Sequence, residues 1–332
     1  MVPSPAPSPW PQVSGVNRIV WAWDTTDTVR YHSTNRGSGT AIFYGDAADG
    51  QLPAHDGMWV YHINGYTIPE QVTTYACESF TFPTDQDRHV VALRPINVSK
   101  YNHHAILHVC LDNDYFARHD SPELCSYHPQ TEPNPSNGQG SSPLGNIGVG
   151  CSGLMWSWAV GMGDFIFPDE AGLRIGATAI SNVILEIHYD NPGEDAGVKD
   201  FMGFEAYYVN TPRANDAAMM IIGDPTVTVG GSPTKWTDAP YTSGDLTAGV
   251  AEHHRQATCP GECTKDFETT INVFAQFYHM HNYGSRMFTE KYATAAAGGA
   301  NLGVVGGRID FWDNGYQQAL ATDYTVAPGE TL

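Results

Sequence analysis

Short segments in which apolar and polar residues alternate recur along the whole chain, and turn-forming Asp, Asn and Gly residues bound them. Alternation with a period of two is typical of β-strands, because successive side chains of a strand leave opposite faces of its sheet. Runs of this kind that are rich in Val, Ile, Phe and Tyr therefore predict strands. These runs cover residues 18–23, 29–32, 41–44, 88–93, 105–109, 183–189 and 271–278.

The pattern predicts an all-β chain, arranged as β-sandwiches or jelly rolls, and disfavours an α/β layout. The 34 Gly and 22 Pro among 332 residues argue against long helices. The length favours about two domains. The Pro/Ser-rich residues 1–17 are predicted to be a disordered linker, residues 130–150 a surface loop, and residues 191–199 a boundary between two sandwiches.

Charge and hydropathy exclude several classes of partner. The formal net charge is −20 and no cluster of Lys or Arg is present, so nucleic acid and anionic membrane surfaces are disfavoured. The apolar stretches are far shorter than the ~20 residues of a spanning helix. No signal peptide is recognisable at the N-terminus of the chain, and its oligomeric state is left open.

The cysteines indicate an oxidising compartment. All six are scattered and none forms a CxxC pair, a pattern that favours disulfides over thiol chemistry. Asn97-Val98-Ser99 is an N-glycosylation sequon, which agrees with a secreted protein or the lumen of the secretory pathway.

Fourteen histidines are the main candidates for chemistry, and the clearest group is His279-Met280-His281. Residues at i and i+2 of an extended chain share a face, so both imidazoles can reach one metal at ~2.0 Å. Two histidines on a solvated strand end are the competing interpretation. His253-His254 lies in a polar segment and is interpreted as solvated.

His103-His104 precedes a predicted strand. Adjacent residues of a strand face opposite sides, so both can bind one metal only where the backbone departs from ideal extension. His104 with His108, which share a face, is a competing grouping. His188 alternates with apolar residues along a predicted strand. It is a candidate ligand only if another metal site lacks its third ligand. Imidazoles with a thioether suit copper, with zinc as an alternative.

Several segments together resemble the copper type II, ascorbate-dependent monooxygenases, the family of dopamine β-hydroxylase and peptidylglycine α-hydroxylating monooxygenase. The matching pieces occur in the family's order from about residue 55 to the C-terminus. They are residues 73–77 (TTYAC), His103-His104 with Cys110 downstream, 158–161 (WAVG), 167–173 (FPDEAGL), 185–192 (LEIHYDNP), Cys259 with Cys263, and His279-Met280-His281 followed by Gly284.

The resemblance implies two jelly-roll-like sandwiches facing each other across a solvent cleft, each holding one of two copper ions. It assigns the first sandwich to residues 51–195 and the second, C-terminally incomplete, to residues 196–332. Residues 18–50 resemble the last strands of a DOMON-like domain, so the chain is interpreted as a core shortened at both ends. The family's methionine ligand would then lie beyond Leu332, and little or no hydroxylase activity is expected of this chain.

The resemblance also implies roles for individual residues. His103, His104 and His188 match the ligands of the electron-donating copper, and His279 and His281 match two ligands of the copper that binds oxygen and substrate. By the same analogy the disulfides are Cys77–Cys125 and Cys110–Cys151. Cys259 and Cys263 either bond to each other or stay free.

The implied activity is hydroxylation of a C–H bond of a small substrate with O2 and ascorbate. Phe277 stands where the peptide-hydroxylating branch has a carboxylate-binding arginine, so that substrate route is lost. Glu205 aligns with a glutamate proposed to face an amine, and its competing interpretation is a solvated strand position. The alternative function is a non-catalytic secreted module that binds copper or another metal without turnover.

Overall fold

Strands make up nearly all the regular structure of the computed structural model. It describes residues 15–22, 36–44, 52–110, 121–125, 151, 153–223, 252–254, 256–280, 284–293, 299–313, 317 and 319–332. Within this part of the chain, the single helix α4 (Gly261–Thr264) falls far below the length that a membrane span requires. The predicted all-β class is confirmed, and predicted strands such as residues 88–93 and 183–189 are present. Most of the expected linker, the expected strand 29–32 and the expected loop 130–150 lie outside the described residues.

A six-stranded sheet forms one layer of the first sandwich. Five of its strands follow one another across the sheet, and one further short strand pairs with β6. The order is β15 (Asn215–Ala217), β11 (Ala171–Ile175), β6 (Arg88–Ile96), β14 (Gly203–Val209) and β3 (Gly57–His62), with β10 (Phe165–Ile166) beside β6.

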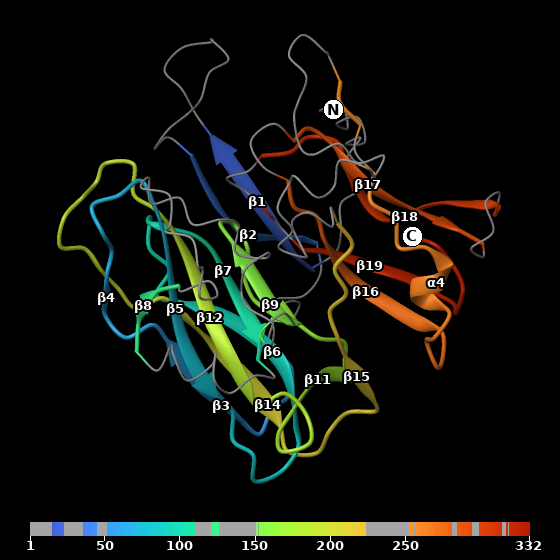
Figure 1. Ribbon diagram of the computed structural model, residues 1–332, viewed down its shortest axis with the longest axis horizontal. Coiled ribbons are helices and arrows are strands. Elements are labelled where there is room, and N and C mark those ends of the chain that lie inside the picture. Colours follow the sequence, from blue (N-terminus) through green and yellow to red (C-terminus); the bar gives the residue numbers. More distant parts are fainter. Residues whose placement is uncertain are drawn as a thin grey trace, which may run out of the picture.

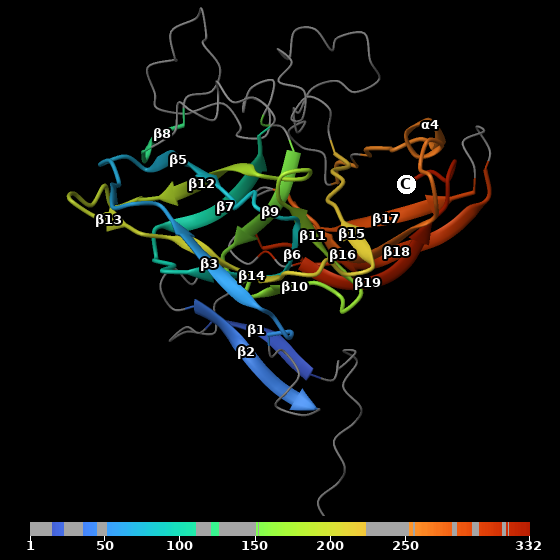
Figure 2. The ribbon, with the colours of Figure 1, turned by 90° about the horizontal axis from the view of Figure 1, so that it is seen from below.

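A five-stranded antiparallel sheet forms the other layer, and Figure 2 shows the two layers edge on. Its order is β8 (Glu123–Leu124), β5 (Thr73–Thr81), β12 (Asn182–Asp190), β7 (Asn102–Val109) and β9 (Gly153–Ala159). A short pair, β4 (Tyr66–Thr67) and β13 (Lys199–Asp200), lies at one end.

The core between the layers follows from strand alternation. On β12, Val183, Leu185, Ile187 and Tyr189 are fully buried and belong to the main apolar cluster, which also takes Phe204 from the six-stranded sheet. The side chains of the intervening residues of β12 project from the outer face of the five-stranded sheet. This outer face carries the histidines described below.

The expected boundary between two sandwiches at residues 195–196 is wrong. Strand β14 pairs with both β3 and β6, and β15 pairs in parallel with β11, so the first sandwich continues through Ala217. Asn191 is fully buried and its side chain exchanges hydrogen bonds with the backbone of Asp195. Residues 191–199 therefore form an internal turn of the first sandwich.

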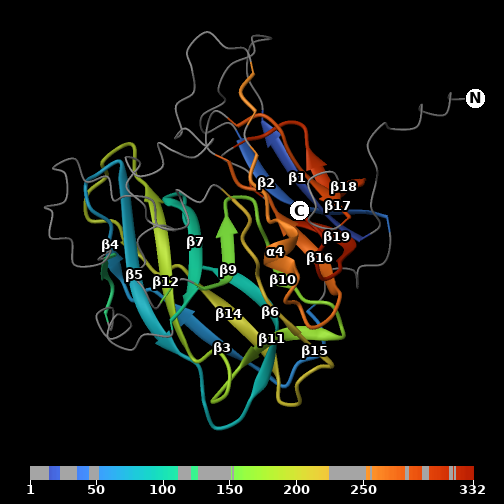
Figure 3. The same cartoon turned by 45° about the vertical axis from the view of Figure 1, so that its right-hand side comes forward.

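The C-terminal strands form two antiparallel pairs beside the first sandwich (Figures 1 and 3). Strand β16 (Ile271–Phe277) pairs with β19 (Ala319–Val326), and β17 (Met287–Tyr292) pairs with β18 (Asn301–Ile309). Phe274 packs against Phe165 and Phe167 of the first sandwich, with ring centroids 6.2 and 5.9 Å away. The remaining described strands, β1 (Gly15–Ala22) and β2 (Arg36–Tyr44), pair only with each other.

Both disulfides implied by the resemblance are present, Cys77–Cys125 and Cys110–Cys151. With Ile184 they form a small cluster on the outer face of the five-stranded sheet, where they extend the buried area beyond the main core. Cys259 and Cys263 do not form a disulfide. The two bridges indicate folding in an oxidising compartment.

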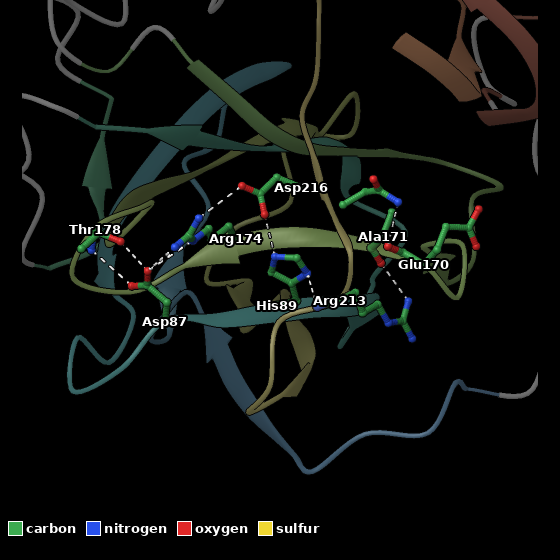
Figure 4. Close-up of polar contacts among 9 residues, drawn as sticks. Asp87, His89, Glu170, Ala171, Arg174, Thr178, Arg213 and Asp216 are labelled. Atoms are coloured by element: carbon green, nitrogen blue, oxygen red, sulfur yellow. Dashed lines mark hydrogen bonds and ion pairs between the residues drawn. The ribbon is translucent and has the colours of Figure 1, made fainter. Parts of the chain in front are cut away.

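A fully buried histidine fixes the segment that leads out of the first sandwich (Figure 4). The backbone N–H of Arg213 donates to Nδ1 of His89 over 3.0 Å, so the ring proton lies on Nε2 and is donated to Asp216 over 2.9 Å. The Arg213 guanidinium in turn donates to the carbonyls of Pro168 and Ala171. These contacts hold β15 against β11.

Replacing Gly172 with alanine is expected to lower the free energy of unfolding by about 1–3 kcal/mol, as overpacking typically does. The new Cβ would lie 2.7 Å from Cβ of His89, which its two hydrogen bonds hold in place. Urea unfolding measures the change. Gly193→Ala is the control, because its nearest neighbour is the exposed side chain of Asp195 at 3.2 Å; equal stability of both variants would contradict the prediction.

Candidate metal centre

A β-bulge brings two adjacent histidines to the same side of the five-stranded sheet. His188 of β12 is opposite His104 of β7, whereas the next residue, Tyr189, is opposite Asn102. His103 is therefore the extra residue of the bulge, and its side chain joins that of His104 on the outer face. This is the departure from ideal extension that two adjacent ligands require.

The side chains of His103, His104 and His188 meet at one point. Nδ1 of His104 lies 3.2 Å from Nδ1 of His103 and 3.3 Å from Nδ1 of His188. All three ligand atoms lie within 4.8 Å of one another, and the side chains are partly buried. Two nitrogen ligands held at ~2.0 Å with a tetrahedral angle would be ~3.3 Å apart, so the observed spacing fits a shared metal ion.

The chemistry of the donor set also fits a cation. A neutral imidazole carries a single N–H group. One proton shared between two facing ring nitrogens therefore forms one hydrogen bond and cannot join a third nitrogen. Nδ1 of His104 faces two such nitrogens at once. A metal ion accepts all three lone pairs together. Three imidazoles without a thiolate or carboxylate suit copper or zinc and disfavour magnesium and calcium.

Neighbouring aromatic and acidic residues shape the surroundings of His188. Tyr75 of β5 stacks on the imidazole with ring centroids 4.3 Å apart and an interplanar angle of 11°. Burial, with a smaller contribution from the negative charge of Glu186, raises the pKa of Tyr75 to about 12. The phenol is therefore neutral near pH 7 and packs against the ring without adding charge to the centre.

A buried carboxylate and a buried imidazole lie close together further along the same face. Glu186 is fully buried, and its Oε2 lies 3.6 Å from Nε2 of His108. His108 is thus partnered by Glu186 and is not part of the three-histidine cluster, so the competing grouping of His104 with His108 is not formed. The sequence interpretation missed Glu186, although its position two residues before His188 places it on the face of the ligands.

The second predicted histidine pair is described in part. His279 follows β16, and its Nδ1 lies 2.7 Å from Oε1 of Gln317. Since a carbonyl oxygen accepts, Nδ1 carries the ring proton and Nε2 is the unprotonated nitrogen. His281 lies outside the described residues.

Glu205 is on the opposite side of the sandwich from the three histidines. Its neighbours Phe204 and Ala206 belong to the core, so the Glu205 side chain projects outward from the outer face of the six-stranded sheet. There it accepts a hydrogen bond from Tyr207 over 2.5 Å and forms an ion pair with Arg94 at 3.8 Å. The core therefore separates Glu205 from the cluster. Phe277 packs against the edge of that core.

The predicted glycosylation site lies at an exposed turn after β6. Asn97 has a left-handed backbone with φ of 54°, and its Nδ2 donates to the carbonyl of Phe201 over 3.0 Å. A glycan at this nitrogen would replace that exposed hydrogen bond. Its attachment stays a prediction.

The fold and site together define a β-sandwich with a cluster of three histidines on one outer face that could hold a metal ion. Residues 59–196, which include all three histidines, match the family described as "Copper type II ascorbate-dependent monooxygenase, N-terminal domain". The resemblance found in the sequence motifs is thereby confirmed.

Several known monooxygenases and hydroxylases align with most of this chain. It is 25% identical to human (Homo sapiens) DBH-like monooxygenase protein 1 over 345 residues, which cover 95% of this chain and 49% of that protein. It is 29% identical to tyramine beta-hydroxylase of Caenorhabditis briggsae over 272 residues, 80% of this chain and 41% of that protein. It is 27% identical to dopamine beta-hydroxylase of Equus caballus over 275 residues, which cover 80% of this chain and 39% of that protein. The chain spans about half the length of these relatives or less.

Proposed function

We propose that this chain acts as a copper-dependent monooxygenase that hydroxylates a C–H bond of a small, amine-bearing substrate with O2 and ascorbate. The observation that carries the proposal is the convergence of three Nδ1 atoms, from His103, His104 and His188, within the region that matches the copper monooxygenase family. The disulfides and the sequon at Asn97 support action outside the cell or in the lumen of the secretory pathway.

In this proposal His103, His104 and His188 hold one copper ion through Nδ1, and Tyr75 keeps the His188 ring in the orientation that this requires. Copper bound there would accept and pass on single electrons from ascorbate. His279 and His281 would hold a second ion, with Gln317 fixing the His279 tautomer. The partly buried position of the three-histidine cluster keeps it within reach of a small reductant.

The substrate class rests on the relatives. Two of them are named for tyramine and dopamine, which are both aromatic amines. Glu205 stays a prediction for recognition of the amine, and Arg94 competes for its carboxylate. Glu205→Gln should therefore raise KM for an amine and leave KM for a neutral analogue unchanged, if the carboxylate has this role.

The test is a copper titration followed by measurement of oxygen uptake with ascorbate, using tyramine, dopamine and a neutral phenyl analogue as substrates. Substrate-dependent uptake with a hydroxylated product is the expected result for a chain that also carries the family's methionine ligand, whereas residues 1–332 alone are expected to bind copper with little or no uptake. Copper binding without product would favour the non-catalytic metal-binding alternative, and a preference for zinc over copper in the same titration would contradict the proposal.

A further inference from the structure

A buried carboxylate lies beneath the three-histidine cluster, on the core side of the five-stranded sheet. Asp200 of β13 is 2% exposed, and its Oδ2 accepts three hydrogen bonds. The donors are the Tyr189 hydroxyl at 2.9 Å, Nδ2 of Asn102 at 3.2 Å and the backbone N–H of Met202 at 3.2 Å. Two of these donors come from the two strands that carry the histidines.

The positions of these donors in the sequence connect them to the ligands. Tyr189 directly follows His188, and Asn102 directly precedes His103. The same two residues are opposite each other across the ladder, on the core side of the β-bulge. Asp200 therefore joins β7 and β12 at the register position where regular pairing stops.

We infer that Asp200 is a positioning residue of the three-histidine centre, an inference that rests on the proposed function. A β-bulge interrupts the ladder hydrogen bonds locally, so its conformation needs other restraints. The backbone N–H of Ser99 donates to Oδ1 of Asn102 over 2.6 Å, which orients the amide so that Nδ2 faces Asp200. Tyr189, Asn102 and Asp200 thus hold the extra residue in place from below.

Loss of this restraint would act on the ligands through strand geometry. If β7 paired regularly with β12 from Asn102 to His104, the side chains of His103 and His104 would project from opposite faces of the sheet. One of them would then point into the core. The centre would then lose one of three ligands for part of the time. Copper affinity should fall before the sandwich itself unfolds.

The test uses the full chain with His279→Ala and His281→Ala in the background, so that copper reports on the three-histidine centre. Tyr189→Phe removes only the hydroxyl, while its ring keeps its stacking on Tyr66. We expect the Cu(II) dissociation constant, measured by chelator competition, to rise about tenfold, in the range for residues that orient metal ligands. The Cu(II) electron paramagnetic resonance spectrum should change with it.

Two further variants complete the experiment. Tyr66→Phe removes a hydroxyl from the stacked neighbouring ring and should leave affinity and spectrum unchanged. Asp200→Asn retains an oxygen acceptor and should bind copper closer to the unmodified level than Asp200→Ala. If Asp200→Ala does not fold, Tyr189→Phe alone decides the question.

The outcomes separate this inference from the proposed function. If the background protein binds copper and Tyr189→Phe matches it in affinity and spectrum, the positioning role is wrong and the proposed function stands. If the background protein itself shows no copper with nitrogen ligands, the proposed function is wrong.

Discussion

Replacing His188 with alanine is expected to eliminate tight copper binding at the three-histidine centre and to reduce the copper content by one ion per chain. His188 supplies one of three Nδ1 atoms that face a common point, and the other two come from a single strand. Loss of a ligand should weaken binding by more than ~100-fold, since loss of a group that merely orients a ligand already costs 10–100-fold. Isothermal titration with Cu(II) under chelator competition measures the change.

His254→Ala is the matched control for this prediction. The His254 side chain is 85% exposed and lies 3.5 Å from Glu252, so it should contribute nothing to the centre. Both variants remove one imidazole and differ only in its place in the fold. Equal loss of copper in the two would mean that histidines bind the metal without a defined site.

Removing the Cys110–Cys151 disulfide by a double alanine substitution is expected to lower the free energy of unfolding by about 4 kcal/mol. The bridge spans 41 residues of sequence, and closing a loop of this length restricts the unfolded chain. Both cysteines are buried in the cluster that contains Ile184, so packing is lost as well. Denaturant unfolding under oxidising conditions measures the difference.

Cys263→Ala serves as the control, because this thiol is exposed and forms no disulfide. Its stability should match that of the unmodified chain within about 0.5 kcal/mol, as is usual for surface substitutions. A double variant as stable as this control would show that the bridge does not restrict the unfolded state.

The three-histidine centre shows where local patterning stops being sufficient. Alternation predicted β12, including the outward position of His188, because a strand residue's side is fixed by its immediate neighbours. The same rule applied to His103-His104 predicts opposite sides. The β-bulge overrides it, and the contacts beneath the bulge come from Asp200, almost 100 residues further along the chain.

The sequence by itself determined the all-β class and strands such as residues 88–93 and 183–189, since these depend on residue type and short-range order, whereas the set of candidate ligands came from the resemblance. The disulfide partners came from the resemblance and agree with the structure. Only the tertiary structure decided that β14 belongs to the first sandwich, that Glu205 faces away from the histidines, and that His108 pairs with Glu186. These features depend on which strands become neighbours, and pairing between distant segments is set by burial of the whole sheet, which no short window of sequence contains.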